Sequence, residues 1–322
     1  MKIKVTQQTI VFGLFLLLFA GFLVLLPGFA QVDNLLTLLQ NVAILGIVGL
    51  GMAVVVIGRG IDISMIAALA VPSGLLLQQV QNGHSLASAI PLVVLLSLAF
   101  GLVNGWLIAY AEVPSLFTTL AMGLFLAGAG QAFLFQLEVV QWPAAMDGIA
   151  WFGRGTLAGL PMPVVMFGLA AATLAVFLKR VRAGTFIYAI GDNPFGARAT
   201  GLPTRPIIML EYVMAALIGL FAGVVMAASV NSMPTRIYNS TMIYDVVLVV
   251  VLGGIGLSGG RGGVLNVIVG TLLIGTMLNG MTILDISYSV QNTIKGVVLL
   301  GAILIDSIIN PRNEETAQQG DI

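Results

Sequence analysis

The chain has no cysteine and a single histidine, His84, among its 322 residues. The absence of cysteine excludes disulfide bonds, thiolate metal sites and a cysteine nucleophile. Charged residues make up only 8% of the chain, against about 25% in soluble domains. Their place is taken by hydrophobic residues, which reach 59%, with a mean hydropathy of +1.08. A water-soluble fold could not bury this much apolar surface, so the composition predicts an integral membrane protein.

Long continuous apolar runs, without strict alternation, indicate that the membrane spans are helices rather than barrel strands. A helix needs about 20 apolar residues to cross a bilayer. The runs that approach this length are 10–30, 36–57, 63–80, 89–110, 116–137, 162–179, 206–230, 243–257, 263–283 and 291–309. The fold class predicted is therefore all-α: one polytopic membrane domain over residues 1–310 with about ten transmembrane helices. A polar, disordered cytoplasmic tail is expected over 311–322.

Lysine and arginine are distributed unevenly between the two sides of this arrangement. With the N-terminus inside, the outer segments hold only Arg154 and Arg236, and Lys295 falls within a span. The inner residues are Lys2, Lys4, Arg59, Lys179, Arg180, Arg182, Arg198, Arg205, Arg261 and Arg312. Because basic residues accumulate in cytoplasmic loops, both termini are predicted to be cytoplasmic. The first run would also suit a signal peptide, but its length and the spans that follow favour an uncleaved helix.

Motifs of soluble enzymes are missing, including the phosphate-binding loop, paired histidine ligands and the nucleophile elbow. The net charge of zero also gives no signature of nucleic-acid binding. The best candidates for functional residues are therefore the polar residues inside spans, because burying them in hydrocarbon is costly. The candidates for a translocation path or gate are Arg59, Asp62, Asn104, Thr118, Thr119, Asp245 and Asn279.

Each of these candidates also has a structural interpretation. Arg59 and Asp62 in "GRGIDIS" (58–64) either pair at a broken helix end or line a gate. Asp245 caps a helix, lies at the membrane interface or contacts a substrate. The uncharged residues suit either interhelical hydrogen bonds or passage of an uncharged, polyhydroxylated solute. Glu211 and Lys295, near span ends, are expected to reach the interface by snorkelling.

A polar, basic segment over 179–206 interrupts the apolar pattern on the cytoplasmic side. Its centre, "GDNPFGARATG" (191–201), predicts a turn, a short helix and a stop. Asp192 or Asn193 can cap the helix, Pro194 suits its first turn, and Gly201 ends it. A short amphipathic helix across the cytoplasmic face is suited to docking a partner.

Several stretches, in order along the chain, resemble one family: the ribose-type membrane permease subunits of bacterial ABC importers for monosaccharides. The stretches are "GMAVVVIGRGIDIS" (51–64), "GLVNGWLIAY" (101–110), "VPSLFTTLAMG" (113–123), "AIGDNPFGARATGLP" (189–203), "VVLVVVLGGIGLSGGRGGV" (246–264) and "GTMLNGMTIL" (275–284). The resemblance covers about residues 35–310. It implies a type II ABC importer-like permease in the bacterial inner membrane, which carries out no catalysis itself.

The resemblance also implies partners and a coupling site. The partners would be an ABC ATPase, often with two fused nucleotide-binding domains, a second permease copy or homologue, a periplasmic sugar-binding protein and membrane lipid. ATP and magnesium would be bound by the ATPase, so this chain is expected to hold no cofactor. The residues implied as ATPase-coupling contacts are Gly191, Asp192, Asn193, Pro194, Ala197, Arg198 and Gly201.

The chain departs from the family pattern at two places, and its sequence also fits two rival functions. Arg59 stands where the family has a glycine, and Ile243-Tyr244-Asp245 stands where it has Glu-Leu-Asp. One rival is a permease of the same architecture for nucleosides or branched-chain amino acids. The other is an ion-coupled secondary transporter, although such proteins place several acids at the bilayer midplane. An internal echo between 54–64 and 249–258 reflects either a duplicated bundle or chance similarity.

Overall fold

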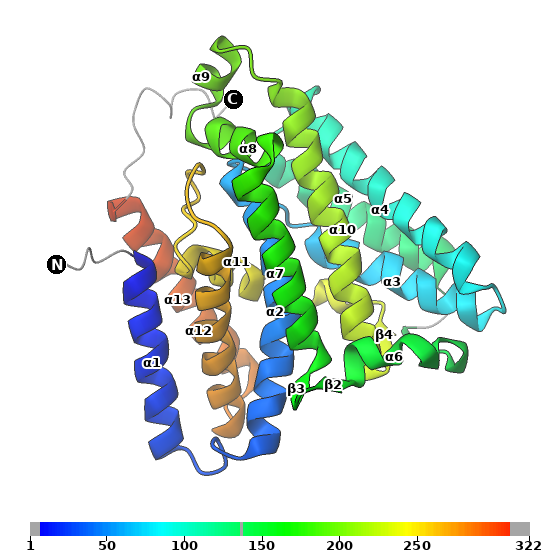
Figure 1. Ribbon diagram of the computed structural model, residues 1–322, viewed down its shortest axis with the longest axis vertical. Coiled ribbons are helices and arrows are strands. Elements are labelled where there is room, and N and C mark those ends of the chain that lie inside the picture. The colour runs from blue at the N-terminus through cyan, green and yellow to red at the C-terminus, as the bar shows by residue number, and fades with distance from the viewer. Residues whose placement is uncertain (1–6, 136–137, 310–322) are drawn as a thin grey trace.

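A computed structural model describes residues 7–135 and 138–309 of the chain, and within these residues the fold is a bundle of α-helices (Figure 1). Ten of the helices correspond to the predicted spans. They are α1 (Gln7–Leu25), α2 (Val32–Ile57), α3 (Met65–Gln81), α4 (Leu86–Ala109), α5 (Ser115–Ala129, continued by a π-helical turn over Gly130–Leu134), α7 (Met162–Arg180), α10 (Thr204–Val230), α11 (Met242–Leu252), α12 (Val264–Ile283) and α13 (Tyr288–Ile309). The predicted tail over 311–322 lies outside the described residues.

Seven of these helices are long and apolar enough to cross a membrane: α1, α2, α4, α5 with its π-helical turn, α7, α10 and α12. The all-α polytopic fold predicted from the sequence is thus confirmed. The two shorter apolar helices are α3 and α11. The run expected over 243–257 is too long, because α11 ends at Leu252, where Gly253 is followed by Gly254 at φ +92°.

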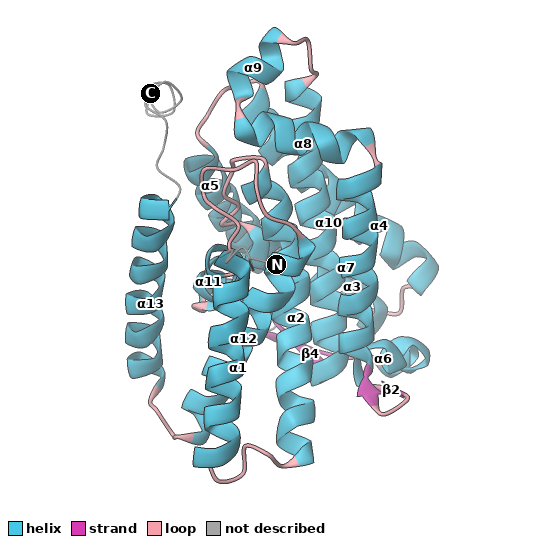
Figure 2. Cartoon of the chain, turned by 60° about the vertical axis from the view of Figure 1, so that its left-hand side comes forward, coloured by secondary structure: helices cyan, strands magenta, loops and turns pink. Residues whose placement is uncertain are grey.

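The centre of the bundle is α2, which is buried over most of its length and packs against α7, α10, α11 and α12. Helices α4 and α10 pack closely along their length, and Gly101 and Gly105 lie directly over the backbone of Val213 and Met209. Small residues of this kind let membrane helices approach closely. In contrast, α1 and α13 stand at the edge of the bundle (Figures 1 and 2).

The two ends of the bundle differ. One end carries α8 (Arg182–Asp192) and α9 (Pro194–Ala199), and we call it the α9 end (Figure 1). The opposite end carries the short helix α6 (Asp147–Arg154) and two small antiparallel pairs. In one, β1 (Val139–Gln141) pairs with β4 (Ser232–Pro234), and in the other β2 (Thr156–Leu157) pairs with β3 (Leu160–Pro161). The described part of α1 begins on the side of the α9 end, and the described part of α13 ends on that side (Figure 1).

The polar segment over 179–206 folds locally as its sequence predicts. The side chain of Asn193 caps α9, with Oδ1 accepting a hydrogen bond from the Gly196 amide at 2.8 Å. Pro194 occupies the first turn, and Gly201 adopts φ +79° just beyond the end. The structure adds α8, a helix that the sequence analysis did not predict. Asp192 therefore ends α8 rather than capping α9.

Candidate functional site

An irregular segment, residues 58–64, separates α2 from α3 within the bundle; we call it the α2–α3 break. Arg59 adopts φ +74° there, and the Gly60 amide bonds back to the Val55 carbonyl at 2.8 Å. The echo segment ends α11 with the same turn, since the Ile255 amide bonds to Val250 at 3.1 Å. This turn also ends α3 and α12, through His84 and Ile286, so it does not by itself indicate a duplication.

Three of the candidates for a path or gate, Asp62, Asn104 and Thr119, lie together at the α2–α3 break. The Asp62 carboxylate is 2% exposed and accepts hydrogen bonds from the amide of Ser64, at 2.9 Å, and from its hydroxyl. The Asn104 amide donates to the Ser64 hydroxyl at 3.0 Å, and the Thr119 hydroxyl accepts from the Ile63 amide at 3.1 Å. Asp62 and Thr119 thus satisfy backbone amides of the break, and Asn104 holds the Ser64 side chain, so the three side chains stabilise the break.

Other predicted path residues lie elsewhere. Thr118 is buried in α5, and Asn279 exchanges hydrogen bonds of 2.9 and 3.1 Å with Asn34, which joins α12 to α2. The pairing of Arg59 with Asp62 that the sequence left open is not among the ion pairs of the described residues. The structure therefore brings four of the seven candidates together at the break, Arg59, Asp62, Asn104 and Thr119, and places Thr118, Asp245 and Asn279 elsewhere.

The expectation that Lys295 and Glu211 snorkel to the interface is wrong. Lys295 is 5% exposed; its ammonium lies 2.9 Å from Asp245 Oδ1 and donates to the Thr241 hydroxyl at 3.1 Å. Glu211 is 1% exposed, and its carboxylate lies over the Cα of Gly58. Lys295 stays in the bundle because it meets a buried counter-charge, and Glu211 has room there because residue 58 is a glycine.

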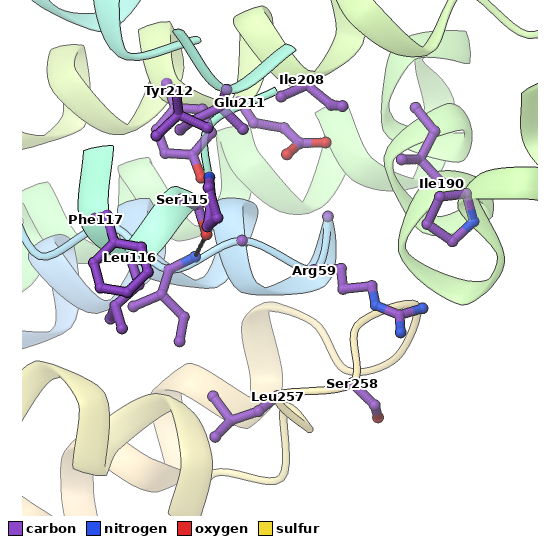
Figure 3. A pocket seen from close by; sticks show the side chains of 17 residues that line it. Arg59, Ser115, Leu116, Phe117, Ile190, Ile208, Glu211, Tyr212, Leu257 and Ser258 are labelled. Atoms are coloured by element: carbon purple, nitrogen blue, oxygen red, sulfur yellow. Dashed lines mark hydrogen bonds between the residues drawn. The ribbon is translucent and has the colours of Figure 1, made fainter. Parts of the chain in front are cut away.

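Three adjoining cavities run along one face of the bundle and share wall residues. The proximal pocket, of about 710 Å³, lies at the α9 end (Figure 3). Its wall is formed by the α2–α3 break, the start of α5, Ile190 and Pro194 of the α8–α9 pair, Glu211 and Tyr212 of α10, and Leu257 and Ser258. The middle pocket, about 310 Å³, lies between α5 and α13 on a floor of α11 and α2. The distal pocket, about 320 Å³, is walled by α11 and α13.

We call these three cavities together the groove. The proximal and middle pockets share Ile61, Leu116 and Leu257, and the middle and distal pockets share Tyr244 and Leu299. The ends of the groove carry polar side chains, including Arg59, Ser115 and Glu211 at one end and Thr241, Asn292 and Lys295 at the other. Its middle is apolar. Of the predicted path residues, Arg59 lines the groove directly, and Asp245 adjoins it through Lys295.

Sequence reasoning missed several groove residues, of which Tyr244, Asn292, Ser115 and Tyr212 are polar. One signal was available: Gly58 and Gly60 flank Arg59, and a side chain at either glycine would overlap Glu211 or Tyr212. These glycines therefore admit the polar pair of α10 into the proximal pocket. Within the part of the chain that the structure describes, no cluster of three or more histidine, aspartate or glutamate residues could hold a metal ion.

The predicted coupling residues divide into exposed and buried groups. Asp192, Asn193, Arg198 and Gly201 are exposed and Pro194 is half-buried, whereas Gly191 and Ala197 are buried. A Cβ atom at Gly191 would overlap the Ile57 carbonyl oxygen at the end of α2. The exposed group can meet a partner, and the buried group shapes the segment from within.

A glycine-rich loop over 253–263 links the α8–α9 pair to the α2–α3 break. The Gly260 amide donates to the Ile57 carbonyl at 2.8 Å, and the Tyr188 hydroxyl of α8 donates to the Gly262 carbonyl at 2.8 Å. Burial raises the pKa of the Tyr188 phenol, so its hydroxyl stays protonated and able to donate at neutral pH. The loop therefore connects α8 to the end of α2, next to the α2–α3 break.

Comparisons with known proteins place this geometry in context. Residues 34–305 match a family model described as "Branched-chain amino acid transport system / permease component". The chain is 31% identical to the ribose import permease protein RbsC of Escherichia coli K12 over 283 residues, covering 87% of this chain and 88% of that protein. It is 33% identical to the protein of the same name from Bacillus subtilis, covering 88% and 87% of the two chains.

A further relative carries a different sugar in its name. The galactofuranose transporter permease protein YtfT of Escherichia coli K12 is 31% identical over 274 residues, which cover 84% of this chain and 78% of that protein. No solved structure matches the chain.

Proposed function

Because the chain belongs to the branched-chain amino acid transport permease family, we propose that it is the membrane permease subunit of an ATP-driven (ABC) importer for a monosaccharide. The observation that carries this function is the match to ribose and galactofuranose permeases over more than three quarters of each chain. ATP hydrolysis then belongs to a separate ATPase subunit, and this chain supplies the path.

The groove is the proposed path. It is open along its side between α5 and α13, so a second permease subunit facing it would close it into a pore. Hydroxyl, amide and charged groups at both ends suit a polyhydroxylated solute, and the apolar middle pocket separates them as a barrier. Arg59, Thr241, Tyr244, Asn292 and Lys295 line this path, and Asp62 with Asn104 and Thr119 holds its wall in shape.

The exposed surface of the α8–α9 pair is the proposed ATPase contact, through Asp192, Asn193, Phe195 and Arg198. This assignment places the α9 end and both termini in the cytoplasm and the β1–β4 end outside, where a sugar-binding protein would deliver its cargo. The basic residues Lys179, Arg180 and Arg182 at the α9 end support this orientation. A bacterial inner membrane fits the family.

One alternative substrate has an observation in its favour, because the name of the matching family model refers to branched-chain amino acids. The curated relatives with sugar names favour the monosaccharide. The deciding experiment reconstitutes the permease with its ATPase and binding protein in proteoliposomes. We expect ATP-dependent uptake of a labelled monosaccharide that excess leucine does not compete with. Uptake that follows an imposed ion gradient without ATPase would contradict the proposal.

A further inference from the structure

The proximal pocket has the size and setting of a small-molecule site. Its volume of about 710 Å³ lies within the range of about 300–1,000 Å³ that ligand pockets occupy. Five parts of the chain contribute to its wall: the α2–α3 break, the α4–α5 connection, α10, the α8–α9 pair and the glycine-rich loop. The pocket therefore lies between parts of the chain that are distant in sequence.

Glu211 is the unusual group in this pocket. Its side chain is almost fully buried, yet Oε1 has no hydrogen-bond partner among the described residues. Figure 3 shows the carboxylate pointing into the space bounded by Ile208, Ile190 and Arg59. Buried polar atoms are nearly always hydrogen-bonded, so an unpaired acceptor aimed into a cavity indicates a missing donor. The backbone leaves room for this side chain because residue 58 is a glycine, and a Cβ atom there would overlap the carboxylate.

The other groups that line the pocket indicate which kind of ligand would donate this hydrogen bond to Glu211. Ser115 accepts a hydrogen bond from the Ile61 amide at 3.2 Å, and its hydroxyl lines the pocket. Ser258 and Tyr212 add two more hydroxyls, and the exposed ring of Phe117 adds an apolar face. A cation such as calcium would need several oxygen ligands, mostly carboxylates, whereas Glu211 is the single carboxylate in this wall. Hydroxyl groups beside an apolar ring match the two-sided surface of a sugar.

We propose that the proximal pocket is an exit site that binds the imported monosaccharide from the cytoplasmic side, with Glu211 accepting a hydrogen bond from a sugar hydroxyl. This inference rests on the proposed function and adds a regulatory consequence to it. A sugar in the pocket bridges Pro194 of α9 and Ile190 of α8 to the α2–α3 break. It therefore opposes the relative movement of these segments and slows the next transport cycle, so that import is inhibited by its own accumulated product.

The test uses the complete importer in proteoliposomes, with ATPase and ATP inside and the binding protein outside. ATP hydrolysis stimulated by the binding protein is measured while the concentration of luminal monosaccharide is raised. For the wild type we expect inhibition, and for Glu211→Ala a half-inhibitory concentration about tenfold higher, because a hydrogen bond to the sugar is lost. Glu211→Gln, which keeps an acceptor oxygen, should fall between the two, and Phe117→Ala should raise the value about threefold.

Glu112→Gln is the matched control. Glu112 is an exposed carboxylate at the same end, paired with Arg205 at 3.3 Å, and does not line the pocket. Its replacement should leave the half-inhibitory concentration unchanged. Each value is a ratio within one variant, so a loss of total activity does not imitate the effect. If Glu211→Ala fails to assemble, Glu211→Gln and Phe117→Ala carry the test.

Two results overturn the inference and are distinguishable from a failure of the proposed function. The first is a wild-type importer that takes up sugar with ATP but is not inhibited by luminal sugar. The second is an unchanged half-inhibitory concentration in Glu211→Ala, which would make Glu211 a packing residue only. A wild-type complex that shows no ATP-dependent sugar uptake would instead overturn the proposed function, and the exit site with it.

Discussion

The ammonium nitrogen of Lys295 lies 2.9 Å from Asp245 Oδ1, and this ion pair joins α13 to α11 beside the distal pocket. The side chains are only 6% and 13% exposed. Thr241 accepts a further hydrogen bond from the same ammonium at 3.1 Å, and Thr241 is bonded in turn to Tyr288 and Asn292. Since α13 makes its principal contacts with α11, the pair fixes one wall of the groove.

Removing one partner of this pair should destabilise the protein strongly. Lys295→Met leaves the Asp245 carboxylate buried without its counter-charge, which costs about 3–5 kcal/mol. The double variant Asp245→Asn with Lys295→Met removes both charges and should recover much of that loss. Thermal unfolding of the purified protein measures both effects. Equal melting temperatures for wild type and Lys295→Met would show that the pair does not hold α13.

Variants at Gly191 and Arg198 should distinguish a role in packing from a role in coupling to the ATPase. Arg198→Glu changes an exposed charge on α9 and is expected to abolish ATP-driven uptake while the protein remains folded. Gly191→Glu forces a side chain against the Ile57 carbonyl, so it should lower the yield of folded protein as well. Yield and melting temperature, measured beside uptake, distinguish the two. Normal uptake by Arg198→Glu would mean that α9 does not contact the ATPase through this residue.

Arg59 holds a left-handed backbone conformation, at φ +74°, that a glycine adopts without cost. Arg59→Gly should therefore relieve about 1 kcal/mol of backbone strain. Arg59→Ala is the matched control, because it removes the guanidinium but keeps the strain. Thermal unfolding should show a gain for glycine over alanine. If alanine is as stable as glycine, the conformation at position 59 is not strained.

Asp62 and Asn104 should be energetically coupled through Ser64. Asp62→Ala leaves the buried Ser64 amide without its acceptor and should cost about 1–3 kcal/mol. Asn104→Ala removes the bond to the Ser64 hydroxyl. The double variant should lose less than the sum of the two single losses, because both act on one network. Simple additivity in a double-mutant cycle would contradict the network.

Much of the fold could be predicted from the sequence because its signals are local. Apolar runs located each membrane helix, and Asn193, Pro194 and Gly201 defined α9, since caps and turns depend on a few neighbouring residues. The end of α11 was misplaced because the apolar run continues through Ile255 and Leu257, past the helix end at Leu252. Helix α8 was missed because it has only 11 residues and its apolar run, over 186–190, is too short to stand out as a span.

The candidate site was harder to predict because its contacts are distant in sequence. Lys295 is buried because Asp245, fifty positions earlier, reaches it from another helix. Glu211 is buried because Gly58 leaves room for it. Neither pairing has a local pattern, so snorkelling was the natural but wrong expectation. The groove itself depends on how α5, α11 and α13 are arranged, which no single stretch determines.

The central claim is that the groove is the path of the transported solute, and the absence of cysteine in this chain allows a direct test. A single cysteine is introduced at Leu120, on the α5 wall of the middle pocket, or at Leu95, an exposed apolar position on α4 outside the groove. Each importer is treated with a water-soluble thiol reagent during ATP-driven transport. We predict that the cysteine at 120 reacts and that import falls as it does, while the cysteine at 95, facing lipid, stays unmodified. A cysteine at 120 that never reacts, or that reacts without loss of import, would contradict the account.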